Sequence, residues 1–120
     1  MKKISVLLVL GLMAFSLCGC AAKEKEEARE ICKQSAKEKI EQYPDANIEK
    51  CYTTYDKEDK EGHTDFCLGG DKMYVLSSTL EKGSKYYDAY YNNYMRDKNA
   101  AENGEEDDYY YFEFSIDELK

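Results

Sequence analysis

The sequence predicts an α+β fold in which one N-terminal amphipathic helix packs on an antiparallel sheet of four or five strands. Two observations lead to this prediction. Between Lys23 and Gln42, small and apolar residues recur every three or four positions, and charged residues fill the remaining positions. After Pro44, the chain consists of short runs rich in Tyr and Thr, separated by turn-forming segments. The helix offers only a narrow apolar stripe, so we expect it to lie on one face of a sheet.

The predicted helix has a clear end. No Gly or Pro interrupts residues 23–42. Pro44 disfavours helical backbone at Tyr43, so the helix should stop there and a turn should follow. The stripe that would face the sheet consists of Ala28, Ile31, Cys32, Ser35, Ala36, Ile40 and Tyr43.

Four later segments are typical of strands. They are residues 48–55, 63–68, 73–80 and 109–116. The first two should form a hairpin around the charged loop at residues 56–62. An acidic loop is expected at residues 97–108. The segment 86–95 fits either a strand or a helix, because its tyrosines have helical spacing but are strong strand formers. The flanking turns and neighbouring strands favour a strand.

The N-terminus carries an export pattern. Two lysines at positions 2 and 3 precede an apolar run from Ile4 to Leu17. The run is shorter than the roughly 20 residues that span a bilayer, and it suits the apolar region of a signal peptide. It ends in Leu17-Cys18-Gly19-Cys20, which resembles the lipobox of bacterial lipoproteins. The resemblance covers this segment alone and implies cleavage before Cys20, with diacylglycerol attached to that thiol.

The chain therefore divides into three predicted parts. Residues 1–19 form a lipoprotein signal peptide, residues 20–22 form the lipidated cysteine and a very short tether, and residues 23–120 form a single domain. We expect a protein that lipid anchors to a membrane and that is exposed on the extracytoplasmic side. The folded domain should lie close to the membrane, because so little chain separates it from Cys20.

The net charge of the chain limits the classes of molecule that it could bind. Two of the 17 basic residues leave with the signal peptide while all 25 acidic residues remain, which changes the formal charge from −8 to −10. An acidic surface repels nucleic acid and anionic lipid head groups. We therefore expect no nucleic-acid partner, and the charge favours solubility, cationic partners or divalent ions.

Three cysteines follow the lipobox, and an exported chain can form disulfides. If the hairpin turns at residues 59 and 60, Cys51 and Cys67 lie opposite each other. A Cys51–Cys67 bridge, with Cys32 free on the helix, would contribute roughly 3 kcal/mol. A bridge from Cys32 to either of the others, or three reduced thiols, are the alternatives.

Signatures of catalysis and cofactors are missing. His63 is the single histidine, so a triad would depend on it, and it lies beside a charged loop. Cys67 would lie roughly 13 Å from it along a strand. The sequence has no glycine-rich phosphate loop, and the acidic runs at 56–62 and 105–108 lack the ligand spacing of an EF-hand. We predict no catalytic residue, no metal ligand and no cofactor.

The tyrosines are the best functional candidates. On strands they would alternate between the two faces of the sheet, so some should be exposed. The predicted binding surface consists of Tyr86, Tyr90, Tyr91 and Tyr94. Exposed aromatic side chains ringed by charge suggest a non-enzymatic module that binds an envelope protein, glycan or other polymer. The alternatives are tyrosines that fill the core and form cross-strand ladders, and a structural or stress-related lipoprotein without a ligand.

Overall fold

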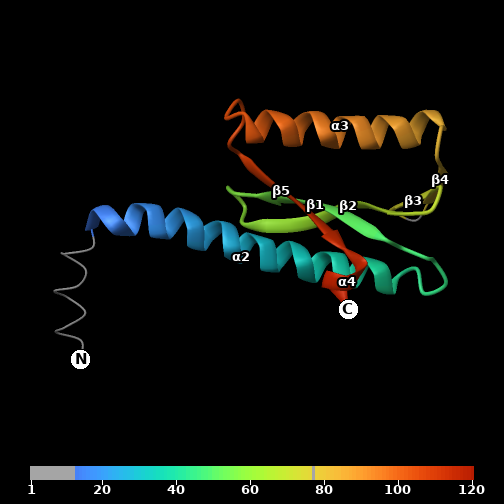
Figure 1. Ribbon diagram of the computed structural model, residues 1–120, viewed down its shortest axis with the longest axis horizontal. Coiled ribbons are helices and arrows are strands. Elements are labelled where there is room, and N and C mark those ends of the chain that lie inside the picture. The colour runs from blue at the N-terminus through green and yellow to red at the C-terminus, as the bar shows by residue number, and fades with distance from the viewer. Residues whose placement is uncertain (1–12, 77) are drawn as a thin grey trace.

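The structure is a computed structural model that describes the backbone of residues 13–76 and 78–120, and side chains from Ala22 onward, again without residue 77. Two long helices, five strands and a short C-terminal helix make up this part of the chain (Figure 1). In order they are α2 (Met13–Glu41), β1 (Lys50–Asp56), β2 (Glu61–Gly69), β3 (Lys72–Val75), β4 (Ser78–Glu81), α3 (Lys85–Glu102), β5 (Tyr109–Ser115) and α4 (Ile116–Leu119).

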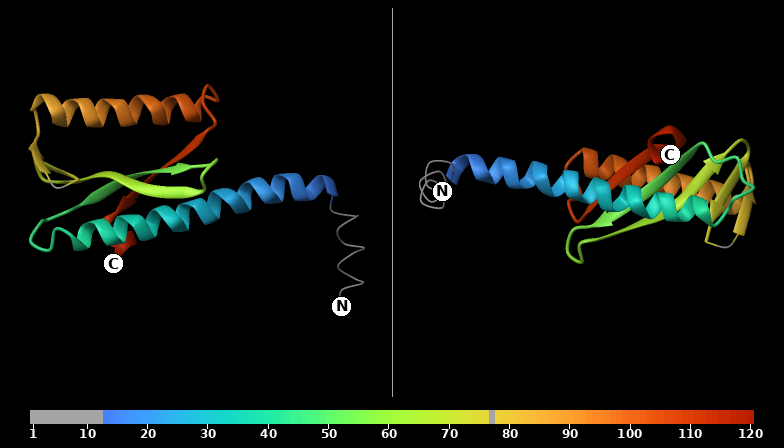
Figure 2. Two further views of the ribbon diagram at one scale, coloured as in Figure 1. Left: turned by 180° about the vertical axis from the view of Figure 1, so that it is seen from behind. Right: turned by 90° about the horizontal axis from the view of Figure 1, so that it is seen from below.

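The five strands form one antiparallel sheet in the order β4-β3-β2-β1-β5. This confirms the predicted fold class, with a helix packed on a five-stranded sheet. The two long helices lie on opposite faces of the sheet, so the domain has three layers (Figures 1 and 2). Each face has its own apolar core, one beneath α2 and one beneath α3.

Helix α2 lies close to the sheet because its contact residues are small. Ala28, Cys32 and Ala36 are fully buried and are spaced four residues apart, so they share one face of the helix. On the sheet, Gly62 faces this helix, and a Cβ atom at that position would lie 2.9 Å from the Cys32 Sγ. Ile31, which the stripe includes, is 42% exposed instead.

The backbone of α2 begins earlier than the predicted helix. It starts at Met13 and continues without a break through Cys20 to Glu41. The signal peptide and lipobox predictions concern residues 1–20, whose side chains lie outside the described part of the structure.

The β1–β2 hairpin has the predicted register around its two cysteines. Cys51 lies directly opposite Cys67, and a disulfide joins them, which confirms the predicted pairing. Cys32 is buried and is not part of that bridge. The register shifts between Tyr52 and Thr53, because Asp65 is an extra residue in β2 that forms a β-bulge.

The predicted strand 73–80 is two strands in the structure. β3 and β4 form a tight hairpin, and Leu76 adopts a left-handed conformation at its tip with φ of 51°. The sequence carries no Gly, Asn or Pro at this turn, which is why the pattern resembled one continuous strand. Two side chains of the α2 region hold the turn, since the Tyr43 hydroxyl and the Lys39 ammonium both donate to the Leu76 carbonyl.

The prediction of a strand at 86–95 is wrong. The segment belongs to α3, whose N-cap is Ser84, and the Ser84 hydroxyl accepts a hydrogen bond from the Tyr87 backbone N–H. Tyr87 and Tyr94 are buried against the sheet and lie on the same face of the helix, about two turns apart. The helical spacing of the tyrosines therefore prevailed over their strand propensity, because a helix with this spacing buries the apolar side chains on the second face of the sheet. The predicted loop 97–108 correspondingly begins only after Glu102.

Candidate functional site

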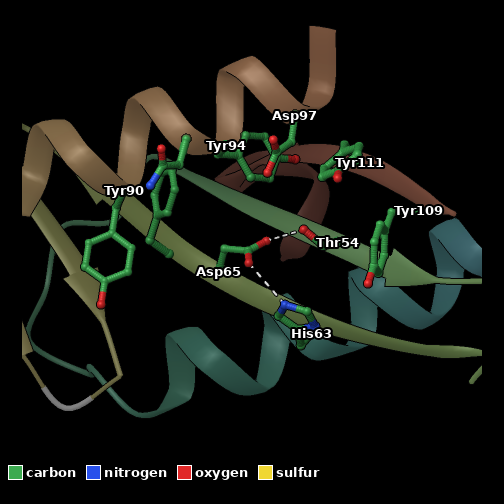
Figure 3. Close-up of a pocket in the computed structure, with 10 residues that line it drawn as sticks. Thr54, His63, Asp65, Tyr90, Tyr94, Asp97, Tyr109 and Tyr111 are labelled. Atoms are coloured by element: carbon green, nitrogen blue, oxygen red, sulfur yellow. Dashed lines mark hydrogen bonds and ion pairs between the residues drawn. The ribbon is translucent and has the colours of Figure 1, made fainter. Parts of the chain in front are cut away.

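A cleft of about 370 Å³ opens between α3 and the sheet (Figure 3). Three strands and the helix contribute its walls: β1, β2 and β5 from below and the middle of α3 from above. The lining side chains are Thr54, His63, Asp65, Phe66, Tyr90, Asn93, Tyr94, Asp97, Tyr109 and Tyr111.

The β-bulge builds the polar centre of this cleft. The extra residue turns the Asp65 carboxylate toward its neighbours on the α3 face of the sheet. The buried Thr54 hydroxyl donates a hydrogen bond to one carboxylate oxygen, and the His63 Nε2 lies 3.1 Å from the other. The hydrogen bond to Asp65 raises the pKa of His63, although partial burial opposes the shift.

Tyr94 forms the floor of the cleft. Its hydroxyl donates to the backbone carbonyl of Thr53 at 2.8 Å and lies 3.1 Å from the carbonyl of Phe112, so it bridges β1 and β5. The rings of Phe66 and Tyr111 meet the Tyr94 ring edge to face. Burial raises the pKa of Tyr94. This tyrosine fixes the helix on the sheet, and its hydroxyl is engaged by the two backbone carbonyls.

The structure separates the four tyrosines of the predicted binding surface. Tyr94 is buried, and Tyr91 is half-buried against the Tyr52 and Phe66 rings. Tyr86 is exposed but does not line the cleft. Tyr90 is 40% exposed and lines the cleft, where exposed Tyr109 of β5 joins it.

Most cleft residues were missed because the bulge and the second helix were not predicted. The spacing of Tyr90, Asn93, Tyr94 and Asp97 places them on one helical face, and this signal was present in the sequence. The bulge at Asp65 left no comparable signal, because no glycine marks it.

The polar centre is not arranged for nucleophilic catalysis. In a hydrolytic triad the imidazole lies between the nucleophile and the carboxylate. Here Asp65 lies between Thr54 and His63, so the imidazole is not placed to take the Thr54 proton. The geometry suits recognition of a polar group by fixed carboxylate, hydroxyl and aromatic surfaces.

A second cleft, of about 510 Å³, opens beside the first half of α3. Tyr52, Tyr87 and Tyr91 line it, together with charged residues of both signs such as Lys82 and Asp88. Lys50, one of its lining residues, is paired with the Glu113 carboxylate, and no carboxylate of a bulged residue points into it as Asp65 does in the first cleft. We therefore regard the first cleft as the functional candidate.

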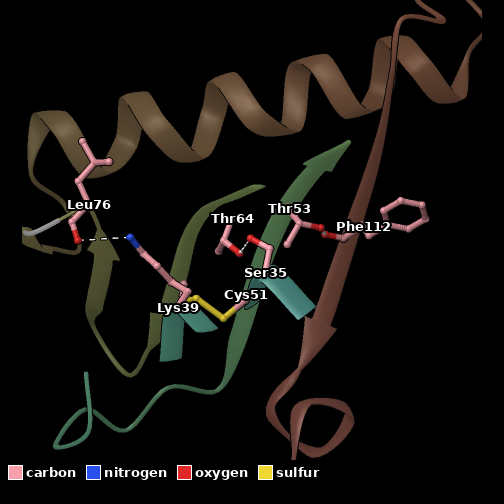
Figure 4. The surroundings of a disulfide bond; sticks show 8 residues. Ser35, Lys39, Cys51, Thr53, Thr64, Leu76 and Phe112 are labelled. Carbon is pink, nitrogen blue, oxygen red and sulfur yellow. Dashed lines mark hydrogen bonds between the residues drawn. A yellow bond between two sulfur atoms is a disulfide. The ribbon is translucent and has the colours of Figure 1, made fainter. Parts of the chain in front are cut away.

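The disulfide lies beneath α2, on the opposite face of the sheet (Figure 4). Both of its cysteines are fully buried, as is Cys32 in the same core. Burial raises the pKa of the Cys32 thiol to about 11, although a hydrogen bond with Thr53 opposes the shift. The thiol is therefore protonated near neutral pH and is not suited to attack a disulfide.

The described residues were also compared with the requirements of a metal site and of a membrane-spanning helix. Within residues 22–76 and 78–120, no three His, Cys, Asp or Glu side chains are grouped so that they could hold a metal ion. None of the helices that the structure describes has the length and hydrophobicity to cross a bilayer.

Comparison with protein-family models, with curated proteins and with solved structures found no match to this chain, so its site is interpreted from its own geometry.

Proposed function

We propose that this chain is a lipid-anchored binding module of the bacterial envelope, and that it holds an envelope protein or polymer in the cleft beneath α3. The bulge at Asp65 carries the proposal. An irregularity that interrupts a ladder and redirects a carboxylate into a cleft costs regular pairing, and such bulges concentrate next to functional sites. The walls around it combine exposed aromatic and polar side chains, as ligand sites do.

The packing of α2 supports the short distance between anchor and domain. Tyr110 of β5 contacts α2 soon after the lipobox: its hydroxyl lies 3.3 Å from the Glu24 carboxylate, and the Lys25 ammonium lies 5.9 Å from its ring centre. Glu24 follows Cys20 by four residues, or about 6 Å along a helix. A lipid on Cys20 would thus hold the domain at the membrane surface by a helical connection.

Photo-crosslinking in living cells tests the occupancy of the cleft. A photoreactive benzoylphenylalanine replaces Asn93, an exposed residue of α3 at the cleft, in the full lipidated protein. The matched control places it at Glu38, an exposed position on α2 at the far face of the sheet. We expect a covalent adduct from position 93 that position 38 does not give.

A cleft-filling variant sharpens this experiment. Tyr90→Trp, in the chain with the photoreactive group at position 93, adds bulk to the cleft wall and should reduce the adduct. Equal adducts from positions 93 and 38, or none from position 93, would remove the proposal and favour a structural lipoprotein without a ligand.

A further inference from the structure

We infer that the cleft takes the ammonium or guanidinium group of a basic polypeptide segment, which adds as a strand along the open edge of β2. This rests on the proposed function and specifies the class of ligand. Three independent features of the described residues lead to it: the sign of the charge in the cleft, its aromatic walls and the unpaired half of β2.

Acidic side chains outnumber basic ones in the lining of the cleft, where His63 is the one basic residue and lies against Asp65. The lining contains the carboxylates of Asp65 and Asp97, and none of the lining residues is Lys or Arg. Arg96 reaches the Asp97 carboxylate, with Nε 3.4 Å from Oδ1, but its side chain is 72% exposed and free to turn away. Burial raises the pKa of Tyr111 most, and the carboxylates of Glu106, Asp97 and Asp65 add to the rise. The cleft therefore favours a cation.

The aromatic walls suit a cation as well. Exposed Tyr90 and Tyr109 stand at the cleft, and the face of a tyrosine ring attracts an ammonium or guanidinium group. The protein uses this contact elsewhere, since the Lys57 ammonium lies 4.3 Å from the centre of the Tyr110 ring. Aromatic faces and carboxylates together favour Lys and Arg side chains over a bare metal ion, which would need several oxygen ligands at once.

An unpaired edge runs along the same cleft. β3 pairs with β2 only at Cys67, Leu68 and Gly69. Among the described residues, Glu61 to Phe66 have a strand neighbour on the β1 side alone. His63 and Asp65 belong to this open stretch and line the cleft. An extended peptide that paired here would direct alternate side chains toward α3, which is the mode of recognition by β-strand addition.

Fluorescence anisotropy with synthetic peptides tests the inference on the full lipidated protein in detergent. The probes are nine-residue peptides that alternate Thr with Lys, with Gln or with Glu. A fourth peptide has the Lys sequence with methylated backbone nitrogens on alternate residues. We expect the Lys peptide to bind about tenfold more tightly than the Gln peptide, which corresponds to about 1.4 kcal/mol. The Glu and N-methylated peptides should bind more weakly still.

Two matched variants separate the cleft from the net charge. Asp97→Asn should weaken binding of the Lys peptide about fivefold, while Asp45→Asn, an exposed residue of the turn after α2, should leave it unchanged. Equal losses in the two variants, equal affinity for the Lys and Gln peptides, or full binding of the N-methylated peptide would each overturn the inference. If the crosslink from position 93 persists in any of those cases, the binding function stands and only the class of ligand is wrong.

Discussion

Thr54 donates a hydrogen bond to Asp65, and this contact ties the bulged residue of β2 to the neighbouring strand β1. Thr54 is buried, whereas the Asp65 side chain is 28% exposed. The bond therefore joins the core to the cleft, and the position of the Asp65 carboxylate depends on it.

The first prediction concerns this bond. Thr54→Val keeps the shape of the side chain and removes the donor, so the free energy of unfolding should fall by about 1 kcal/mol. Urea denaturation measures the change. Thr79→Val, at an exposed position on β4, is the control and should change stability by less than half as much. A neutral Thr54→Val would mean that water supplies the bond equally well.

The second prediction concerns the disulfide. Cys51→Ala with Cys67→Ala opens a loop of about 15 residues, so the free energy of unfolding should fall by roughly 3 kcal/mol. In the wild-type protein at pH 8, Cys32 should resist alkylation until denaturant is added, because its thiol is buried and its pKa is raised. Rapid labelling of Cys32 in native protein would contradict the packing of α2 on the sheet.

The third prediction concerns the close approach of α2 and the hairpin. Gly62→Ala places a methyl group 2.9 Å from the Cys32 Sγ and 3.1 Å from the Ile31 Cγ2, so it should destabilise the protein by about 1–3 kcal/mol. Cys32→Ala relieves the tighter contact. The double variant should therefore lose less stability than the two single variants predict by addition. Additive losses would show that the crowding does not involve the sulfur.

The fourth prediction follows from the raised pKa of His63. The folded protein holds the imidazolium against Asp65 more favourably than the unfolded chain does. The resulting stability is present below the unfolded pKa of about 6.5 and is lost as the pH rises through the folded value. Its size should be below about 1 kcal/mol, because the His63 side chain is 62% exposed.

Urea denaturation of wild type and His63→Gln at pH 5.5 and pH 8 checks this effect. The difference in stability between the two proteins should be larger at pH 5.5. Asp56, Asp65 and Asp97 are carboxylates near the ring or in the same cleft, and the comparison at fixed pH removes their common contribution. A difference that is larger at pH 8 would reverse the sign and refute the assignment.

The fifth prediction concerns the anchor. Cys20→Ala removes the thiol that the lipobox resemblance assigns to the lipid, so the protein should leave the membrane fraction of the cells. Two acyl chains anchor far more firmly than one, and the shift should therefore be nearly complete. Cys32→Ala is the matched control and should remain in the membrane fraction.

The hairpin and the disulfide could be predicted because local rules determine them. A charged loop joins the two strands as a hairpin, and the predicted register holds on the far side of the bulge, where Cys51 lies opposite Cys67. The bulge at Asp65 lies between that loop and the cysteines, and it could not be predicted because it depends on hydrogen bonds that form only in the assembled sheet.

The tyrosines show where local rules fail. Between residues 86 and 95 their high strand propensity favours a strand and their spacing favours a helix. In the folded protein this segment is a helix. Because that helix covers the second face of the sheet, Tyr94 became core and the candidate surface moved to a cleft.

The continuity of α2 has a mechanical consequence. The helix that would carry the lipid also packs on β1, β2 and β5, and Arg29 ties it to Glu118 of the C-terminal helix. A pull on the anchor would therefore act along the helix axis and load all of these contacts in parallel, as shear. The disulfide beneath the helix would keep the hairpin from separating under that load. The domain would thus resist tension at the membrane as one unit, because the strands beneath α2 would share the load instead of separating one after another.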